Sequence, residues 1–197
     1  MTEKEKMLSQ QYYNSWDNEL VEEREQAKSL IFELNSLNPF EREKRLQIIK
    51  KLLPNVGKKI WLESPFNCDY GGNITFGENF YANTNFTVLD GAPVKIGNNV
   101  LVGPNVSLYT VNHAFDVAAR NAGLEQALPI TIGDNVWLGG SVVILGGVTS
   151  GDNTIIGAGS VVTHNIEANV LAVGNPARVL RQLTDADKKR HYKSTFI

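Results

Sequence analysis

Apolar residues recur at every sixth position through most of the second half of the chain. Twelve six-residue units share this period, and they begin at Ile74, Phe80, Phe86, Val94, Val100, Val106, Ile130, Val136, Val142, Val148, Thr154 and Ser160. The first position is apolar in ten of the twelve units, the third is usually apolar, and Gly or Asn is frequent from the fourth to the sixth. Because successive side chains of a strand alternate in direction, the first and third positions share a side, while the Gly/Asn end can bend with positive φ. Each unit is therefore predicted to form one short strand and one bend.

The regular six-residue period, which is broken only by the extra pair Ala92-Pro93 and by one long interruption, predicts a parallel β-helix. Three units close a triangular coil of 18 residues, and successive coils stack about 4.8 Å apart with first-position side chains in the interior. A β-sandwich of short strands is the alternative, but it predicts loops of variable length. The phase instead survives the one long interruption, residues 112–129, because Val106 and Ile130 are 24 residues, or four units, apart. We expect the β-helix to span residues 60–177, with residues 112–129 as a protruding loop.

The N-terminal third has a pattern typical of amphipathic helices. Within residues 17–34, apolar side chains fall at near-helical spacing among charged ones. The stretch NPFEREKRLQIIKKLLPNVG repeats this pattern, with Asn38 as the expected N-cap and Pro39 at the first helical position. Residues 1–59 are therefore predicted to form a separate two-helix segment.

Composition and charge fit an ordinary globular protein. The chain has 197 residues, of which 42% are apolar, and a net charge of −2. Residues 60–177 carry nine acidic and two basic side chains, which argues against a long nucleic-acid surface. Residues 178–197 carry six basic and two acidic groups and are expected to form a short helical tail. The N-terminus lacks the apolar core of a signal peptide, and no apolar run approaches about 18 residues, so we expect a cytoplasmic protein that binds neither nucleic acid nor membrane.

A histidine stands at the start of the interruption, within the stretch LYTVNHAFD. His113 is one of only three histidines in the chain. An imidazole has a reference pKa of about 6.5, so it can accept a proton from a weakly acidic hydroxyl and later return it to a leaving group. The alternative is a histidine that only forms hydrogen bonds within its own loop.

Several motifs of the chain resemble those of the hexapeptide-repeat acyltransferases, in the maltose and galactoside O-acetyltransferase branch. They are YYNSWDNEL, CDYGGNITFGENFYANTNFTVLD, IGNNVLVGPNVSLYTVNH, PITIGDNVWLGG, IIGAGSVVT and AVGNPARVL, which together cover most of the chain. The resemblance implies a left-handed β-helix, a homotrimer, and acetyl-CoA bound in the cleft between neighbouring subunits. It also implies direct transfer of the acetyl group to a sugar hydroxyl, with His113 as the general base.

The resemblance assigns further residues to the site. For the sugar acceptor it implies Asn83 as an active-site residue, together with Asp69, Asp90 and Asp17. Asp90 substitutes for a carboxylate that the galactoside branch has at the next position, where this chain has Gly91. The galactoside branch has its other acidic residue two positions before Asp17, where this chain has Ser15, so either Asp17 or Ser15 is expected to contact the acceptor. For acetyl-CoA it implies small or polar residues along the later coils and basic residues for the phosphates: Gly140, Ala158, Thr163, His164, Arg178 and Arg181. Trp137 is expected either to wall the acetyl site or to lie at a subunit interface.

Other chemistries receive little support from the sequence. Cys68 is the single cysteine, so it can form neither an intramolecular disulfide nor a cysteine zinc site, and we interpret it as a small buried side chain. A γ-type carbonic anhydrase needs three metal-binding histidines per site, whereas here His191 lies outside the repeats. We expect no metal. The remaining alternatives are an antibiotic-modifying acetyltransferase on the same scaffold and a noncatalytic β-helical module for sugar binding or assembly.

Overall fold

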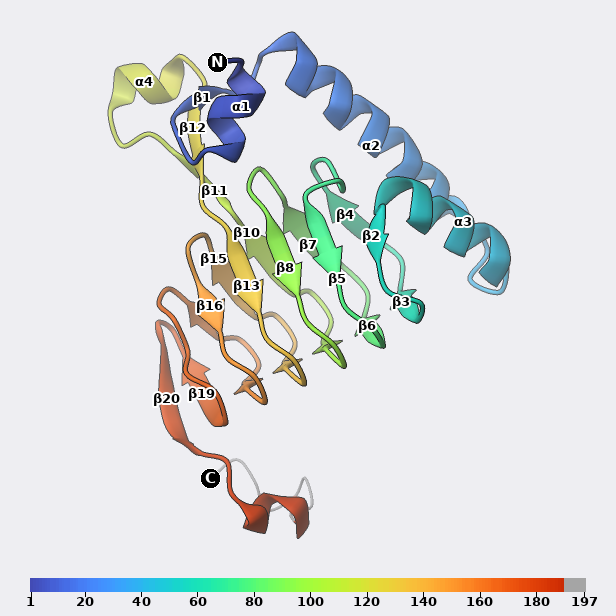
Figure 1. Ribbon diagram of the computed structural model, residues 1–197, viewed down its shortest axis with the longest axis vertical. Helices are drawn as coiled ribbons and strands as arrows, with labels where there is room; N and C mark the ends of the chain where they lie inside the picture. Colours follow the sequence, from blue (N-terminus) through green and yellow to red (C-terminus); the bar gives the residue numbers. More distant parts are fainter. Residues whose placement is uncertain (190–197) are drawn as a thin grey trace.

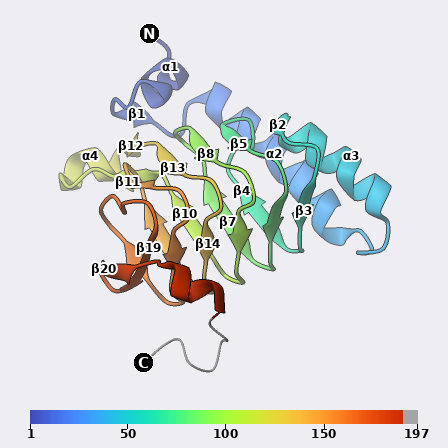
Figure 2. The ribbon, with the colours of Figure 1, turned by 60° about the horizontal axis from the view of Figure 1, so that its bottom comes forward.

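The parallel β-helix predicted from the repeat is confirmed. The computed structural model describes residues 1–189, so His191 lies outside the described part. Stacked coils run along one axis, with helices α2 (Asn18–Ser36) and α3 (Arg42–Leu52) packed at one end and β20 (Ala177–Gln182) at the other (Figures 1 and 2). Because both ends of the stack are covered, its walls and corners are the surfaces that remain open to a ligand.

Three sheets form the walls. The first face contains β2 (Asn55–Val56), β5 (Ile74–Phe76), β8 (Val94–Ile96), β13 (Ile130–Ile132) and β16 (Thr149–Ser150). The second face contains β3 (Ile60–Leu62), β6 (Phe80–Ala82), β9 (Leu101–Val102), β14 (Trp137–Leu138), β17 (Ile155–Ile156), β19 (Val170–Gly174) and β20. The third face contains β4 (Phe66–Cys68), β7 (Phe86–Leu89), β10 (Ser107–Tyr109), β15 (Val143–Leu145) and β18 (Val161–Val162). Neighbouring strands of each face pair in parallel, except that β19 and β20 are antiparallel.

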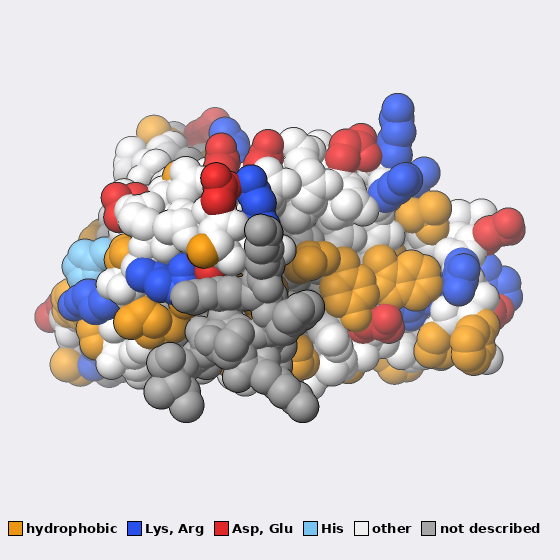
Figure 3. Space-filling model, turned by 90° about the horizontal axis from the view of Figure 1, so that it is seen from below, with side chains coloured by type: hydrophobic (Ala, Val, Ile, Leu, Met, Phe, Trp, Pro, Cys, Tyr) orange, Lys and Arg blue, Asp and Glu red, His pale blue; other side chains and the backbone are white. Residues whose placement is uncertain are grey.

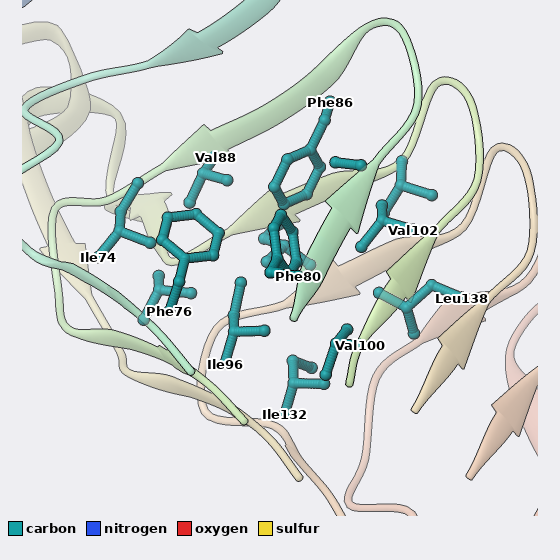
Figure 4. Packing of buried hydrophobic residues seen from close by; sticks show 14 of the residues in the cluster. Ile74, Phe76, Phe80, Phe86, Val88, Ile96, Val100, Val102, Ile132 and Leu138 are labelled. Carbon is teal, nitrogen blue, oxygen red and sulfur yellow. The ribbon is translucent and has the colours of Figure 1, made fainter. Parts of the chain in front are cut away.

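The interior is filled by the first and third positions of the repeat. All twelve first positions are buried, including the two polar ones, Thr154 and Ser160. The Thr154 hydroxyl donates to the carbonyl of Gly151 at 2.7 Å, and the Ser160 hydroxyl donates to that of Gly157 at 2.6 Å. In the wider coils near the helices, aromatic residues fill the centre, as Figure 4 shows for Phe76, Phe80 and Phe86. The hexad pattern therefore describes the core of the β-helix correctly.

Asparagine ladders hold the corners between coils. The sixth position of many units has a positive φ, for example 58° at Asn79, 55° at Asn99 and 58° at Asn135. The side-chain amide of Asn79 donates to Asn99 Oδ1 at 3.0 Å, and that of Asn99 donates to Asn135 Oδ1 at 3.1 Å. Asparagine tolerates the left-handed region of backbone conformation, and its side chain also forms a hydrogen bond with the equivalent residue in the next coil. Each of these two properties stabilises the corner.

The N-terminal segment differs from the prediction in three ways. A further helix, α1 (Glu3–Leu8), precedes α2, and Thr2 caps it with a capping box. Helix α3 begins at Arg42 rather than at Pro39, because Asn38 Oδ1 accepts from the Phe40 amide in a turn instead of capping a helix. The β-helix begins at β2, before residue 60, so the predicted boundary is too late.

Buried Arg45 fastens the helices to the first coil. Its side chain is only 4% exposed. The guanidinium donates to the carbonyls of Leu34 and Leu62 at 3.1 and 2.8 Å, and to the Ser64 hydroxyl at 3.0 Å. Helices α2 and α3 are therefore held to the β-helix by polar as well as apolar contacts.

The interruption of the repeat is an ordered hairpin and not a loop. Strands β11 (Val111–His113) and β12 (Leu124–Ala127) pair antiparallel, and the short helix α4 (Val117–Asn121) lies between them. On its other side β12 pairs with β1 (Tyr13–Asn14), which forms a three-stranded sheet, β1-β12-β11. The N-terminus and the hairpin thus form one substructure at one corner of the β-helix (Figure 1).

The beginning of the C-terminal tail is a strand, which corrects the predicted helical tail. Strand β20 extends the second face, and a 3-10 helix, η1 (Asp185–Lys189), follows it. Within residues 1–189, no helix is both long and apolar enough to cross a membrane.

The asparagine ladders generate a stability prediction at Asn99. Asn99→Ala and Asn99→Gly both remove the two ladder hydrogen bonds, but only alanine is strained at a φ of 55°. Left-handed strain is about 1–2 kcal/mol, and it is partly offset by the greater flexibility of glycine in the unfolded chain. The free energy of unfolding in urea should therefore be about 1 kcal/mol lower for Asn99→Ala than for Asn99→Gly. Equal or greater stability of the alanine variant would refute the strained corner.

Candidate active site

A pocket of about 320 Å³ opens where the hairpin leaves the β-helix. Residues from the N-terminal segment, from α2, from the turn after β4, from the end of β7 and from the hairpin line it: Tyr13, Ser15, Trp16, Arg24, Asp69, Tyr70, Leu89, Val111, His113 and Glu125. Hydroxyl, carboxyl, guanidinium and imidazole groups thus converge beside the indole of Trp16. Such a mixture of polar groups and an aromatic surface suits a small polyhydroxylated molecule.

The hairpin presents His113 to this pocket. His113 is the last residue of β11, and its side chain is 64% exposed. Its cross-strand neighbour Glu125 is only 18% exposed and lies with one carboxylate oxygen 3.8 Å from His113 Nδ1. The other carboxylate oxygen of Glu125 accepts from the hydroxyl of buried Tyr13 at 2.9 Å. The imidazole is therefore accessible, while the groups beneath it are fixed.

Asp90 is buried behind the turn that carries Asp69, and it does not line the pocket. Its side chain is fully buried, and its carboxylate accepts from the backbone amides of Asp69, Tyr70 and Gly71 at 3.0, 2.9 and 2.8 Å. Burial raises the pKa of Asp90, while the three amide donors oppose that shift. The sequence-based expectation that Asp90 contacts the acceptor is corrected: Asp90 shapes the turn that carries Asp69.

Asp69 is the carboxylate of this turn that faces the pocket. Burial and the negative charge of Asp90 raise the pKa of Asp69 to about 6, although Arg24 acts in the opposite direction. Within residues 1–189 its carboxylate receives no hydrogen bond. An unsatisfied, partly buried carboxylate in a pocket is a group suited to binding hydroxyl donors.

Two further residues expected at the acceptor site lie elsewhere. Asp17 is the N-cap of α2, where its carboxylate accepts from the Glu19 amide at 3.1 Å, and Ser15 lines the pocket in its place. Asn83 follows β6, at the corner between the second and third faces, and its side chain accepts from the Thr84 amide at 2.8 Å. The strand β7, four residues long, separates that corner from the pocket.

A groove of about 440 Å³ runs along the corner between the second and third faces, from the coil that follows Asn83 towards the C-terminal end of the β-helix. It is lined by small residues of successive bends together with apolar side chains: Gly103, Pro104, Trp137, Gly139, Gly140, Ile155, Ile156, Gly157, Ala158 and Val173. The close spacing of the coils requires glycine here, because a Cβ at Gly139 would lie 2.6 Å from the Ala158 amide nitrogen. The backbone is therefore exposed to a ligand along the groove, and Asn83 occupies the equivalent position one coil above Gly103.

The six residues expected to bind the coenzyme are divided between places. Gly140 and Ala158 line the groove. Thr163 and His164 follow β18, below the pocket on the corner that carries His113, and the Thr163 hydroxyl lies 2.8 Å from His164 Nδ1. Arg178 is paired on β20 with Val173, which lines the groove. Arg181 is held by Asp187 through two hydrogen bonds of 2.9 and 2.8 Å.

The remaining expectations concern Cys68, Trp137 and metal ions. Cys68 is 7% exposed, and burial raises the pKa of its thiol, which fits a packing role. Trp137 is 40% exposed and lines the groove, which is compatible with both roles expected for it. Among the described residues, no group of three or more His, Cys, Asp or Glu side chains is placed to hold a metal ion.

Sequence reasoning missed Tyr13, Arg24 and Glu125. Arg24 donates to the Tyr70 hydroxyl at 2.7 Å and lies over the Tyr70 ring, which fixes one wall of the pocket. Tyr13 and Glu125 meet only because β1 pairs with β12 across more than a hundred residues of sequence. No local pattern marks this pairing.

Comparisons with known proteins agree with this architecture. Residues 6–57 match the maltose acetyltransferase hexapeptide capping motif, and residues 129–164 match the bacterial transferase hexapeptide. The chain is 48% identical to galactoside O-acetyltransferase of Escherichia coli (strain K12), over 88% of this chain and 86% of that one. It is similar to the crystal structure of a maltose O-acetyltransferase from Clostridium difficile 630, with 50% identity, a TM-score of 0.92 and coverage of 94% and 99% of the two chains. It is also similar to a galactoside acetyltransferase in complex with coenzyme A, with 44% identity, a TM-score of 0.94 and coverage of 98% and 96%.

The raised pKa of Asp69 generates a pH-dependent stability prediction. An unfolded aspartate has a pKa of about 3.9, so the folded protein holds this proton more tightly. Protonated Asp69 therefore favours the folded state. This contribution to the free energy of unfolding is complete below about pH 4 and is lost as the pH rises through about 6. Asp69→Asn should therefore increase the free energy of unfolding by about 1–2 kcal/mol at pH 7, after allowance for partial exposure, and have little effect at about pH 4. Urea unfolding at both pH values measures this difference, and a gain independent of pH would contradict it.

Proposed function

Because the chain belongs to the maltose and galactoside O-acetyltransferase family of hexapeptide-repeat enzymes, we propose that it transfers the acetyl group of acetyl-CoA to a hydroxyl of a sugar. The observation that carries this proposal is the exposed imidazole of His113 at the mouth of a polar pocket. The acceptor and its reacting hydroxyl would lie in that pocket, against His113.

The proposed reaction is a direct transfer. His113 accepts the proton of the sugar hydroxyl as its oxygen attacks the thioester carbonyl carbon. The carbon–sulfur bond then breaks, and the proton passes from His113 to the departing thiolate of coenzyme A. A covalent route through Cys68 is disfavoured, because this thiol is buried and its pKa is raised.

Pocket chemistry supports a sugar as the acceptor. Asp69 offers a carboxylate to hydroxyl donors, Ser15 and Arg24 offer polar atoms, and the exposed indole of Trp16 offers a flat apolar surface. A sugar presents hydroxyl groups around its edge and C–H groups on its faces, so both kinds of group find a partner.

The groove suits the donor. Coenzyme A is extended, and its pantetheine amides can bond with backbone groups that glycine and alanine leave accessible at Gly140 and Ala158. The C-terminal end of the groove lies near Arg178, which can pair with phosphate oxygens. Arg181 is already paired with Asp187, so it would serve the phosphates only by exchanging that partner.

Geometry supports a homotrimer in which each site combines two copies of the chain. His113 and the groove lie at different corners of one subunit, separated by the width of the third face, where β7 alone spans about 13 Å. A neighbouring subunit can bring its groove to the His113 corner. The outward column of the second face is apolar and consists of Trp61, Tyr81, Leu101, Trp137 and Ile155. The outward column of the first face is instead polar, with Thr75, Lys95 and Thr131. Figure 3 shows apolar side chains gathered in a band on the side of the second face. A threefold arrangement would cover this surface.

His113→Ala should reduce acetyl transfer by roughly two to four orders of magnitude, the range expected for loss of a general base. Coenzyme binding should be almost unchanged, because His113 is not among the residues that line the groove. Thiol release with a panel of sugars measures turnover, and calorimetric titration with coenzyme A measures binding. A folded His113→Ala enzyme that retains wild-type turnover would refute the proposed mechanism.

Arg178→Ala should raise the Michaelis constant for acetyl-CoA much more than that for the sugar. Hydrogen bonds to charged groups contribute about 1.5–3 kcal/mol, but Arg178 is exposed, so we expect the lower end, roughly a tenfold effect. The same assay with acetyl-pantetheine, which lacks the nucleotide phosphates, should not distinguish the variant from the wild type. An equal defect with the truncated donor would mean that Arg178 supports structure instead of binding phosphate.

A further inference from the structure

Three residues of the small sheet form a single row beside the pocket. In β1-β12-β11, Glu125 of the central strand is directly opposite Tyr13 on one side and His113 on the other. Directly opposed residues of neighbouring strands project on the same side of a sheet, so their side chains can interact. The fold therefore places a carboxylate between a phenol and the imidazole.

The contacts within this row are ordered from the interior to the surface. Tyr13 is 1% exposed, and its hydroxyl donates to Glu125 Oε2 at 2.9 Å. Glu125 Oε1 lies 3.8 Å from His113 Nδ1, slightly beyond hydrogen-bond length, so a small rotation of the exposed imidazole would close the contact. Burial and the charge of Glu125 raise the pKa of Tyr13, which keeps the phenol a proton donor at all ordinary pH values.

The other charged groups of the pocket do not compete for this position. Asp69 and Tyr70 are on the turn after β4, and Arg24, on α2, is bonded to Tyr70 and to the Ser15 carbonyl. Within residues 1–189, Glu125 is the only acidic side chain within ion-pair distance of His113. Glu125 is thus the carboxylate that can pair with His113 Nδ1.

We propose that Glu125 is the positioning residue of the general base: it accepts a hydrogen bond from His113 Nδ1–H and directs Nε2 towards the acceptor hydroxyl, while Tyr13 fixes Glu125. This inference rests on the proposed function of His113. The carboxylate also stabilises the imidazolium that forms when His113 takes the proton of the acceptor. Glu125 itself is not the base, because it is largely buried and one of its oxygens is occupied by Tyr13.

Kinetics of four variants test this role. Glu125→Gln keeps the shape of the side chain but loses its charge, and it should lower kcat by about 10- to 100-fold with little change in the Michaelis constants. We expect less than the loss known for a fully buried carboxylate–histidine pair, because His113 is 64% exposed. Tyr13→Phe should lower kcat by less than tenfold. In the Glu125→Gln background, Tyr13→Phe should add almost nothing, because Tyr13 acts through Glu125. Glu33→Gln, an exposed position of α2, controls for loss of a carboxylate.

A spectroscopic measurement separates positioning from a structural role. Nitrogen chemical shifts of ¹⁵N-labelled histidine should show His113 mainly as the Nδ1–H tautomer in the wild type and a shift towards Nε2–H in Glu125→Gln. Unchanged kcat and tautomer in folded Glu125→Gln would overturn the proposal. A rise in the acceptor Michaelis constant without loss of kcat would also overturn it, by making Glu125 a sugar ligand. His113→Ala separates this failure from that of the general-base mechanism, because it remains inactive if only the role of Glu125 is wrong.

Discussion

The closed interior of each coil is the constraint on which the rest of the structure depends. Each first-position side chain must enter an interior that three short strands enclose, and all twelve of them are buried. An insertion can therefore leave the stack only at a corner, between strands, and the chain must return in phase. The hairpin that carries His113 does so: β8 and β13 pair in register as Val94 with Ile130, 36 residues apart, although the coils around them are about half as long. The candidate base is thus held at a corner by the same packing that stabilises the core.

This constraint also separates the chemical functions in space. One corner carries His113 and the polar pocket, and another carries the groove with its glycine-lined bends. The third face lies between them, and its interior is filled by side chains such as Phe86, Val88 and Leu108. Because a β-helix is a packed solid and not a channel, a donor in the groove cannot reach His113 through the subunit. In the proposed trimer, repetition of one rigid wall around a threefold axis brings the two corners together. Catalytic geometry then depends on the assembly as much as on the chain.

Local patterns predicted those features that local physics decides. The hexads predicted the interior columns because every unit obeys the same alternation, and even Thr154 and Ser160 follow it by bonding to nearby carbonyls. Helix α1 was missed, although Thr2 and Glu5 form a recognisable capping box in its sequence. Features that depend on distant pairing could not be read. The roles of Tyr13 and Glu125 require β1 to meet β12, and the burial of Asp90 depends on amides of the preceding coil. In the sequence Asp90 resembles a residue that binds the acceptor, but in the structure its carboxylate holds the turn that carries Asp69.

The central claim is that His113 of one copy acts on a donor held by the groove of another. Two variants test it together: His113→Ala removes the base, and Gly140→Trp fills the groove at a position where a Cβ has an ordinary contact distance of 3.4 Å to Pro104. Each variant alone should be inactive. After the two are unfolded together in equal amounts and refolded, about one interface in four should combine an intact His113 with an intact groove, so about a quarter of wild-type acetyl transfer should return. If base and groove belong to the same subunit, no mixed assembly contains an intact site, and the mixture will remain inactive.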